Sequence, residues 1–161
     1  MVVKIPITIS EQEFIEGLKK VKSNKHKAAY VLAFYQCMRV SEVVKLQPEN
    51  IDKARGFIHI LQAKGSKDRD IPIMKPTLNA FKHIPIGLTP RALQLACRKI
   101  WFGKGFHFHC LRHSGATMYL NVKKIDIRMI QQLLGHSRID TTMIYTHVTP
   151  DNLKTAFDEV W

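Results

Sequence analysis

The segment Gly56–Ile73, GFIHILQAKGSKDRDIPI, limits what this chain can fold into, because apolar and polar residues alternate along it. Side chains alternate across a strand, so this pattern predicts a β-hairpin with one strand near Phe57–Ala63 and a return strand at Arg69–Ile73. Pro72 has no backbone N–H and therefore places the return strand at a sheet edge. A short strand near Asn50–Asp52 would complete a three-stranded antiparallel sheet.

Helical spacing and capping signals surround this hairpin. Ser10 followed by Glu13 is a capping box that opens an amphipathic helix over residues 11–21. Further helices are expected to begin after Asn24, at Ser41, at Thr89-Pro90, in HCLRHSGATMYL, at Asp126, at Asp140 and at Pro150. Gly135 ends the helix that Asp126 caps, as a left-handed C′ residue. The pattern predicts a single α+β domain over residues 1–161, mostly helical, with the small antiparallel sheet at one edge.

Charge and cysteine content restrict the partners and the compartment. The chain carries 25 Lys and Arg against 13 Asp and Glu, a net charge of +12. Such an excess favours a polyanionic partner, above all nucleic acid. Cys37, Cys97 and Cys110 form no C-x-x-C pair and lie in apolar patterns, which indicates free thiols in a reducing compartment. No stretch approaches membrane-spanning length and no signal peptide opens the chain, so we expect an intracellular protein without a membrane partner.

The segment HFHCLRHS contains residues suited to binding a phosphate. His109 and Arg112 are three residues apart and would share one helix face. A guanidinium fork beside an imidazole can hydrogen-bond several phosphate oxygens, although an ordinary exposed face could carry the same pair. A zinc site is not expected from His107, His109 and His113, because Cys110 stands where zinc proteases place a Glu and the segment has no carboxylate.

Three other segments carry polar residues of interest, each weak evidence alone. Arg39 in CMRVSEVVKL lies at a helix junction, where it could be solvated or paired with Glu42. Lys64 in AKGSKD stands at the mouth of a β-turn, which suits a proton donor and equally suits a plain polar turn. His136 follows a helix end in LLGHS, and Tyr145 comes nine residues later.

Taken in order, these segments resemble the catalytic domain of the tyrosine recombinases, the family of phage integrases and chromosome-dimer resolvases. The family's ordered set is an Arg in a G-x-R-x-S-E-like segment, a Lys in a β-turn, H-x-x-R, then a Gly-His pair and a Tyr. The matching residues are Arg39 in MRVSEV, Lys64 in AKGSKD, His109 and Arg112 in HCLRHS, His136 in LLGHS and Tyr145 in TTMIYTHV. The resemblance covers roughly Ser10 to Trp161.

The resemblance implies that the chain breaks and rejoins DNA at specific sites through a 3′-phosphotyrosine. Tyr145 would be the nucleophile. Arg39 and Arg112 would clamp the two non-bridging oxygens as the phosphorus becomes five-coordinate, and His136 would hydrogen-bond the same phosphate. We expect Tyr145 to lie on a segment that moves, while His136 belongs to the fixed part of the site.

Proton transfer would complete the reaction that the resemblance implies. His109 is the candidate base for the phenol of Tyr145, and Lys64 the candidate acid for the departing 5′ oxygen. Lys67 and Arg69 compete with Lys64 as the acid, and the family pattern favours Lys64. The phosphotyrosine bond retains the energy of the broken phosphodiester, so no metal, nucleotide or other cofactor is expected.

Double-stranded DNA is the expected partner. Arg91, Gln94 and Arg98 line one stripe of a predicted helix that could enter a DNA groove, although a solvated face is an equal alternative. Lys67 and Arg69 are further candidates for DNA contact. The resemblance also implies a homo-oligomer, a tetramer on DNA, with a monomer possible in isolation.

Two parts of the family pattern leave alternatives open. The apolar stripe within Leu153–Trp161 is either core or a tail that docks on a neighbouring subunit. Relatives usually carry an N-terminal DNA-clamping domain, which is missing from this chain, so the chain is a fragment or a minimal protein with salt-dependent DNA binding. The rival functions are strand relaxation of the type IB topoisomerase kind and a catalytically idle basic DNA-binding module.

Overall fold

The computed structural model describes residues 7–61, 68–101, 105–135 and 150–161. Helices are α1 (Glu11–Lys19), α2 (Asn24–Tyr35), α3 (Val40–Lys45), α4 (Pro90–Ile100), α5 (Phe108–Asn121), α6 (Ile127–Leu134) and α7 (Pro150–Asp158). Strands are β1 (Ile51–Asp52), β2 (Phe57–Ile60) and β3 (Arg69–Pro72), and short 3₁₀ turns lie at Pro48–Asn50, Lys75–Thr77 and Ala80–His83. The expected α+β class, mostly helical with one three-stranded antiparallel sheet, is confirmed.

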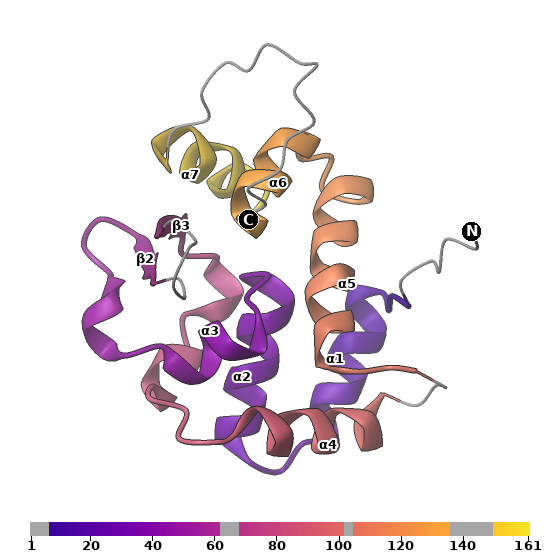
Figure 1. The fold of residues 1–161 in the computed structure, drawn as a ribbon. Coiled ribbons are helices and arrows are strands. Elements are labelled where there is room, and N and C mark those ends of the chain that lie inside the picture. Colours follow the sequence, from indigo (N-terminus) through magenta and orange to yellow (C-terminus); the bar gives the residue numbers. More distant parts are fainter. Residues whose placement is uncertain (1–6, 62–67, 102–104, 136–149) are drawn as a thin grey trace, which may run out of the picture.

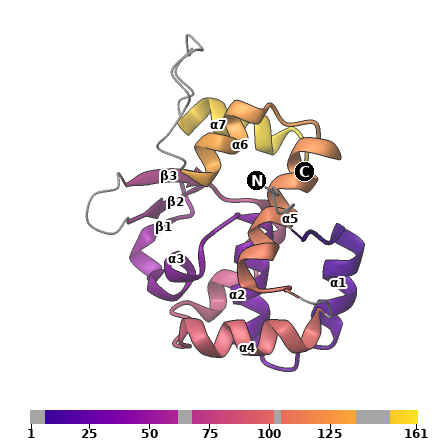
Figure 2. The same ribbon diagram turned by 45° about the vertical axis from the view of Figure 1, so that its right-hand side comes forward.

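The sheet has the order β1-β2-β3, with both pairs antiparallel (Figure 2). Ile58 pairs with Ile71 and both are buried, whereas the next pair, His59 with Asp70, faces outward. The predicted edge position of Pro72 is confirmed. The strands are shorter than the alternation predicted: β2 ends at Ile60, and β3 ends at Pro72.

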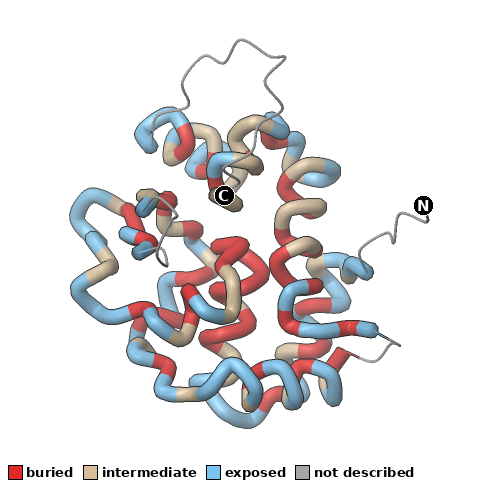
Figure 3. The backbone as a smooth tube through the Cα atoms, viewed as in Figure 1, coloured by how far each residue is buried: buried red, intermediate tan, exposed pale blue. Residues whose placement is uncertain are grey.

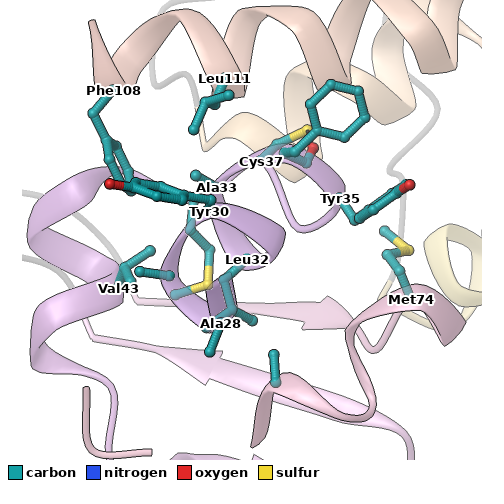
Figure 4. Close-up of a cluster of buried hydrophobic side chains, with 14 of the residues drawn as sticks. Ala28, Tyr30, Leu32, Ala33, Tyr35, Cys37, Val43, Met74, Phe108 and Leu111 are labelled. Carbon is teal, nitrogen blue, oxygen red and sulfur yellow. Dashed lines mark hydrogen bonds between the residues drawn. The ribbon is translucent and has the colours of Figure 1, made fainter. Parts of the chain in front are cut away.

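Helices α2 and α5 form the centre of the core, and α2 lies between the sheet and α5 (Figures 1 and 3). Helix α2 is apolar around most of its circumference, which is the pattern of a helix covered on all sides. Gly115 lets α5 approach α2 closely, because a Cβ at that position would collide with the carbonyl oxygen of Phe34. Figure 4 shows Phe108 and Leu111 of α5 above Tyr30 and Ala33 of α2.

The helix ends follow most of the sequence signals. The Thr89 hydroxyl accepts from the Ala92 N–H (3.1 Å), and the Asp126 carboxylate accepts from the Arg128 N–H (2.8 Å). Gly135 adopts φ 67° at the end of α6, as predicted. These caps satisfy N–H and C=O groups that a helix leaves unpaired at its ends, so they fix where α4 and α6 begin and stop.

The prediction that Ser41 caps a helix is wrong. Helix α3 begins at Val40, so Ser41 lies in its first turn, and Arg39 occupies the N-cap position. The N–H of Arg39 is instead satisfied by the Glu42 carboxylate, which accepts from it at 2.8 Å. Glu42 can do this because it stands three residues after the cap, the spacing of a capping box.

Helix α7 packs on its own chain. Leu153 and Phe157 are buried, and the Phe157 ring meets Tyr119 edge-on with centroids 4.7 Å apart. Trp161 lies against Tyr35, with centroids 5.6 Å apart. In Figures 1 and 2 α7 lies beside α6. In this single chain the stripe therefore packs as part of the core.

The structure bears on the cysteines and on membrane spanning. Cys37, Cys97 and Cys110 are buried free thiols. Within the described part of the chain, no helix is both long and apolar enough to cross a membrane. Residues 64–67 of the turn at KGSKD and the helix expected at Asp140 lie outside the described residues.

Candidate phosphate-binding active site

A sharp turn after α2 places Arg39 at the start of α3. Cys37 follows the helix with φ 51°, a left-handed conformation that costs a residue other than glycine about 1–3 kcal/mol. This conformation reverses the chain, so Arg39 arrives at the start of α3. Its side chain is 36% exposed, and its Nη1 lies 3.2 Å from Oε1 of Glu42. Arg39 is therefore anchored at one side and accessible at the other.

Arg112 lies deep on α5, with only 2% of its side chain exposed. Its Nη1 donates to the carbonyl of Cys37 and its Nη2 to the carbonyl of Leu134, both at 2.7 Å. Burial, and then the neighbouring charge of Arg39, lowers the pKa of Arg112 to about 10, so the guanidinium stays charged at neutral pH. The two carbonyls fix its plane between the α2–α3 turn and the end of α6.

Glu42 is the buried carboxylate at which three guanidinium groups meet. Its side chain is 4% exposed and contacts Arg39, while Arg112 Nη1 lies 3.9 Å from its Oε2. Arg69 binds both oxygens, with Nη1 at 2.9 Å and Nη2 at 3.3 Å. Among the described residues, three cations therefore surround one anion. This surplus of positive charge attracts a phosphate.

Arg69 is a predicted DNA contact and a competitor for the role of the acid, and in the structure it lies at Glu42 beside Arg39 and Arg112. Its side chain is only 8% exposed, its Nη groups bind Glu42, and its Nε donates to the carbonyl of Leu133 at 3.2 Å. The alternation of residues along β3 indicates that the Arg69 side chain is buried. Arg69 and Ile71 lie two residues apart on β3 and share a face, and that face is turned inward.

An open cleft of about 380 Å³ joins the start of α3, the face of α4 and the start of α5. It is lined by Arg39, Val40, Ser41, Gln94, Arg98, His107, Phe108 and His109. Two of the predicted DNA contacts, Gln94 and Arg98, thus line the same cleft as Arg39 and His109. Arg91 is exposed one turn earlier on α4.

His109 remains accessible from the cleft, while the surrounding protein removes part of its hydration. This partial burial, followed by the charges of His113 and Arg112, lowers the pKa of His109 to about 4. The pKa of His113 is also lowered, by burial and then by Arg112. The ring centroids of His109 and His113 are 4.5 Å apart. Both imidazoles are therefore neutral at physiological pH, and a neutral imidazole can accept a proton.

The structure thus brings together Arg39, His109 and Arg112 from the predicted set. Lys64, Lys67, His136 and Tyr145 lie outside the described residues. Among the described residues, no group of three or more His, Cys, Asp or Glu side chains is placed to hold a metal ion.

Two residues of the site were missed or undervalued from the sequence. From the sequence, Glu42 is identified only as a neighbour of Arg39, although its capping-box spacing indicates a carboxylate directed back toward the helix start. His107 is identified only as one of three histidines weighed for a metal site. It is the N-cap residue of α5 and lines the cleft beside Arg98 and His109.

Comparison with known proteins assigns the chain to a family. Residues 10–87 and 88–152 match the phage integrase family. The tyrosine recombinase XerA of Pyrococcus furiosus is 32% identical over 96% of this chain and 62% of its own length. The tyrosine recombinase XerC of Pseudomonas fluorescens is 36% identical over 78% of this chain and 49% of its own length. The integrase of mycobacterium phage Brujita shares the fold, with a TM-score of 0.78 and 21% identity over 99% of this chain and 60% of that one.

The chain therefore belongs to the phage integrase family of tyrosine recombinases. It spans between about half and two thirds of the length of these curated relatives.

Proposed function

We propose that this chain cuts and rejoins DNA at specific sites through a covalent 3′-phosphotyrosyl intermediate. The observation that carries the proposal is the convergence of Arg39, His109 and Arg112 on one cationic site beside an open cleft. The relatives XerA and XerC are tyrosine recombinases, and their similarity covers 96% and 78% of this chain.

The two arginines suit the charge that develops on a phosphate under attack. As phosphorus becomes five-coordinate, its non-bridging oxygens gain negative charge, and fixed donors lower the barrier most in that state. A guanidinium has five N–H groups, and the carbonyls of Cys37 and Leu134 take two from Arg112. Arg39 lines the cleft and is 36% exposed, so a phosphate in the cleft could reach it, and Arg112 has further N–H groups besides the two that bind carbonyls.

Tyr145 would form the new bond. Its phenolic oxygen attacks phosphorus, the bond from phosphorus to the 5′ oxygen breaks, and a 3′-phosphotyrosine results. His109, neutral because of its low pKa, would accept the phenol proton. Lys64 would protonate the leaving 5′ oxygen, with Lys67 as the competitor, and His136 would donate to the phosphate. The family pattern supplies these assignments for Lys64, His136 and Tyr145.

Double-stranded DNA is the proposed substrate, and a homotetramer on DNA the proposed working form. The net charge of +12 and the exposed Arg91, Gln94 and Arg98 on α4 support a DNA surface that continues from the cleft. A 5′-hydroxyl from a second strand would reverse the cleavage step and rejoin the DNA.

The test uses trapping of the covalent intermediate. A pool of labelled duplexes with a randomised core and a nick near the cleavage position is incubated with the protein in EDTA, so that the cleaved end diffuses away. Covalent adduct is recovered under denaturing conditions and its DNA is sequenced. We expect adduct with the wild type, enrichment of one core sequence, and no adduct with Tyr145→Phe.

The other outcomes identify the rival functions. Retarded DNA with no adduct from either protein would support an idle binding module. Adduct without sequence enrichment, together with relaxation of supercoiled plasmid, would support topoisomerase-like activity. Cleavage that disappears in EDTA would contradict the metal-free mechanism.

A further inference from the structure

We propose that Arg69 is a positioning residue of this site, which holds Glu42 and the end of α6 so that Arg39 and Arg112 remain directed at the phosphate. The proposal rests on the function proposed above. It assigns to Arg69 a role distinct from DNA contact and from acid catalysis.

The geometry of Arg69 connects three elements through one side chain. It is the first residue of β3, binds both oxygens of Glu42 on α3, and donates from Nε to the carbonyl of Leu133 on α6. Residues 62–67, which include Lys64, lie between β2 and β3 in the sequence. His136 comes two residues after the end of α6. Arg69 therefore links the segments that flank two of the residues assigned to catalysis.

The end of α6 is held by two arginines on consecutive carbonyls. Leu133 accepts from Arg69, and Leu134 accepts from Arg112 at 2.7 Å. These carbonyls belong to the helix end that has no partners within the helix and carries partial negative charge, so cations stabilise it. Arg69 also packs against Gly135, where an added Cβ would lie 3.0–3.1 Å from its guanidinium end. Arg69 of β3 thus holds the end of α6 at Gly135, the residue before His136.

The charge balance explains why Arg69 matters to the other arginines. A buried carboxylate that loses one cationic partner interacts more strongly with the cations that remain, because burying a poorly compensated charge is costly. Without Arg69, the available partners of Glu42 among the described arginines are Arg39 at 3.2 Å and Arg112 at 3.9 Å. Glu42 would then draw their N–H groups away from the phosphate. By binding both oxygens of Glu42, Arg69 weakens the pull of this carboxylate on Arg39 and Arg112.

Three roles for Arg69 make different predictions. A DNA contact would weaken DNA binding and lower its salt dependence. A purely structural role would lower stability and leave the rate of the folded protein unchanged. A positioning role lowers the cleavage rate at saturating DNA while affinity stays nearly constant, because the arginines lose their geometry only toward the transition state.

The experiment measures all three quantities on Arg69→Gln and Arg69→Lys in the full chain. Rates of adduct formation are measured in single turnover with saturating nicked DNA, affinity by fluorescence anisotropy on Tyr145→Phe backgrounds, and stability by thermal unfolding. We expect Arg69→Gln to slow adduct formation about 100-fold with affinity changed less than about threefold. A lysine at this position can donate to Glu42 but cannot also reach the carbonyl of Leu133, so Arg69→Lys should slow adduct formation about tenfold.

Arg91→Gln provides the matched comparison, since it removes an exposed arginine of α4. It should weaken binding, which is the result expected for the loss of a DNA contact. The coupling of Arg69 to Glu42 is tested by Arg69→Gln combined with Glu42→Gln, which should cleave faster than Arg69→Gln alone because the negative charge that pulls on Arg39 and Arg112 is then removed.

A wild-type rate in either folded Arg69 variant, or a loss of affinity that parallels Arg91→Gln, would overturn the positioning role. If Arg69→Gln does not fold, Arg69→Lys decides by the same criteria. Absence of adduct from the wild type would instead refute the proposed function, so the two failures are distinguishable.

Discussion

Helices α5 and α4, which form two walls of the cleft, differ in how they hold their arginines. On α5, Arg112 is 2% exposed and fixed by the carbonyls of Cys37 and Leu134. On α4, Arg91 and Arg98 are exposed. A group that stabilises a transition state must already be in place, so fixing Arg112 in advance favours chemistry. An accessible arginine can follow the shape of a DNA backbone, so the α4 wall favours recognition.

The largest effect that this comparison predicts is for Arg112→Gln. We expect the single-turnover rate of adduct formation at saturating DNA to fall about 1,000-fold, equivalent to about 4 kcal/mol of transition-state stabilisation. The free energy of unfolding should also drop by about 2–3 kcal/mol, because the buried carbonyls of Cys37 and Leu134 lose their donors. Urea unfolding measures the second effect.

Arg112→Lys serves as the control for charge at this position. A lysine keeps the charge but lacks the fork that reaches Cys37 and Leu134 together. Its rate should therefore stay within about tenfold of that of Arg112→Gln. A rate close to wild type in Arg112→Lys would show that charge alone is needed, and the contrast between the two walls would fail.

The opposite signature is predicted for Arg98→Gln on the α4 wall. We expect affinity for DNA to fall about three- to tenfold, and the slope of log affinity against log salt to decrease by about one, since a phosphate contact is lost. The rate at saturating DNA should not change. Binding titrations at several salt concentrations measure the slope.

Lys99→Gln is the matched control for Arg98→Gln, because Lys99 is exposed on α4 but does not line the cleft. It should change the affinity and the salt slope less than Arg98→Gln does. Equal effects from both variants would mean that α4 acts through general positive charge and that the cleft wall has no special part in binding.

The sequence predicted those features that depend on local rules. Alternation located the hairpin, and cap chemistry located the starts of α4 and α6 at Thr89 and Asp126. The family pattern selected Arg39, His109 and Arg112, which the structure brings to one site. Each of these inferences needed only neighbouring residues or an ordered motif.

The missed features depend on contacts between distant segments. Glu42 could be seen as a partner of Arg39, but its bond to Arg69 joins residues 27 positions apart. The bond from Arg69 to Leu133 spans 64 positions. Arg69 shares the strand face of Ile71, a signal that the sequence-based prediction of a DNA contact did not use. A buried arginine is tolerated only with a partner, and no local rule identifies that partner.

The smallest predicted effect concerns His109, which lines the cleft from the start of α5. In the DNA-free protein, an NMR titration of its imidazole should give a pKa of about 4, lowered first by burial and then by His113 and Arg112. An unfolded chain protonates histidine near pH 6.5. Between pH 6.5 and 4 the unfolded state therefore binds more protons at this position, so His109 lowers stability as the pH falls and contributes no pH dependence above pH 6.5.

The midpoint of thermal unfolding should consequently fall less between pH 6.5 and 4 in His109→Asn than in the wild type. Near pH 8 the pH dependence of the midpoint should be the same in both proteins. The same low pKa keeps the imidazole able to accept the Tyr145 proton throughout the physiological range. A phosphate bound in the cleft should raise the pKa, because an anion favours the imidazolium. A midpoint near 6.5 in the DNA-free protein would contradict this prediction, because it would show that neither burial nor the neighbouring charges disfavour the imidazolium of His109.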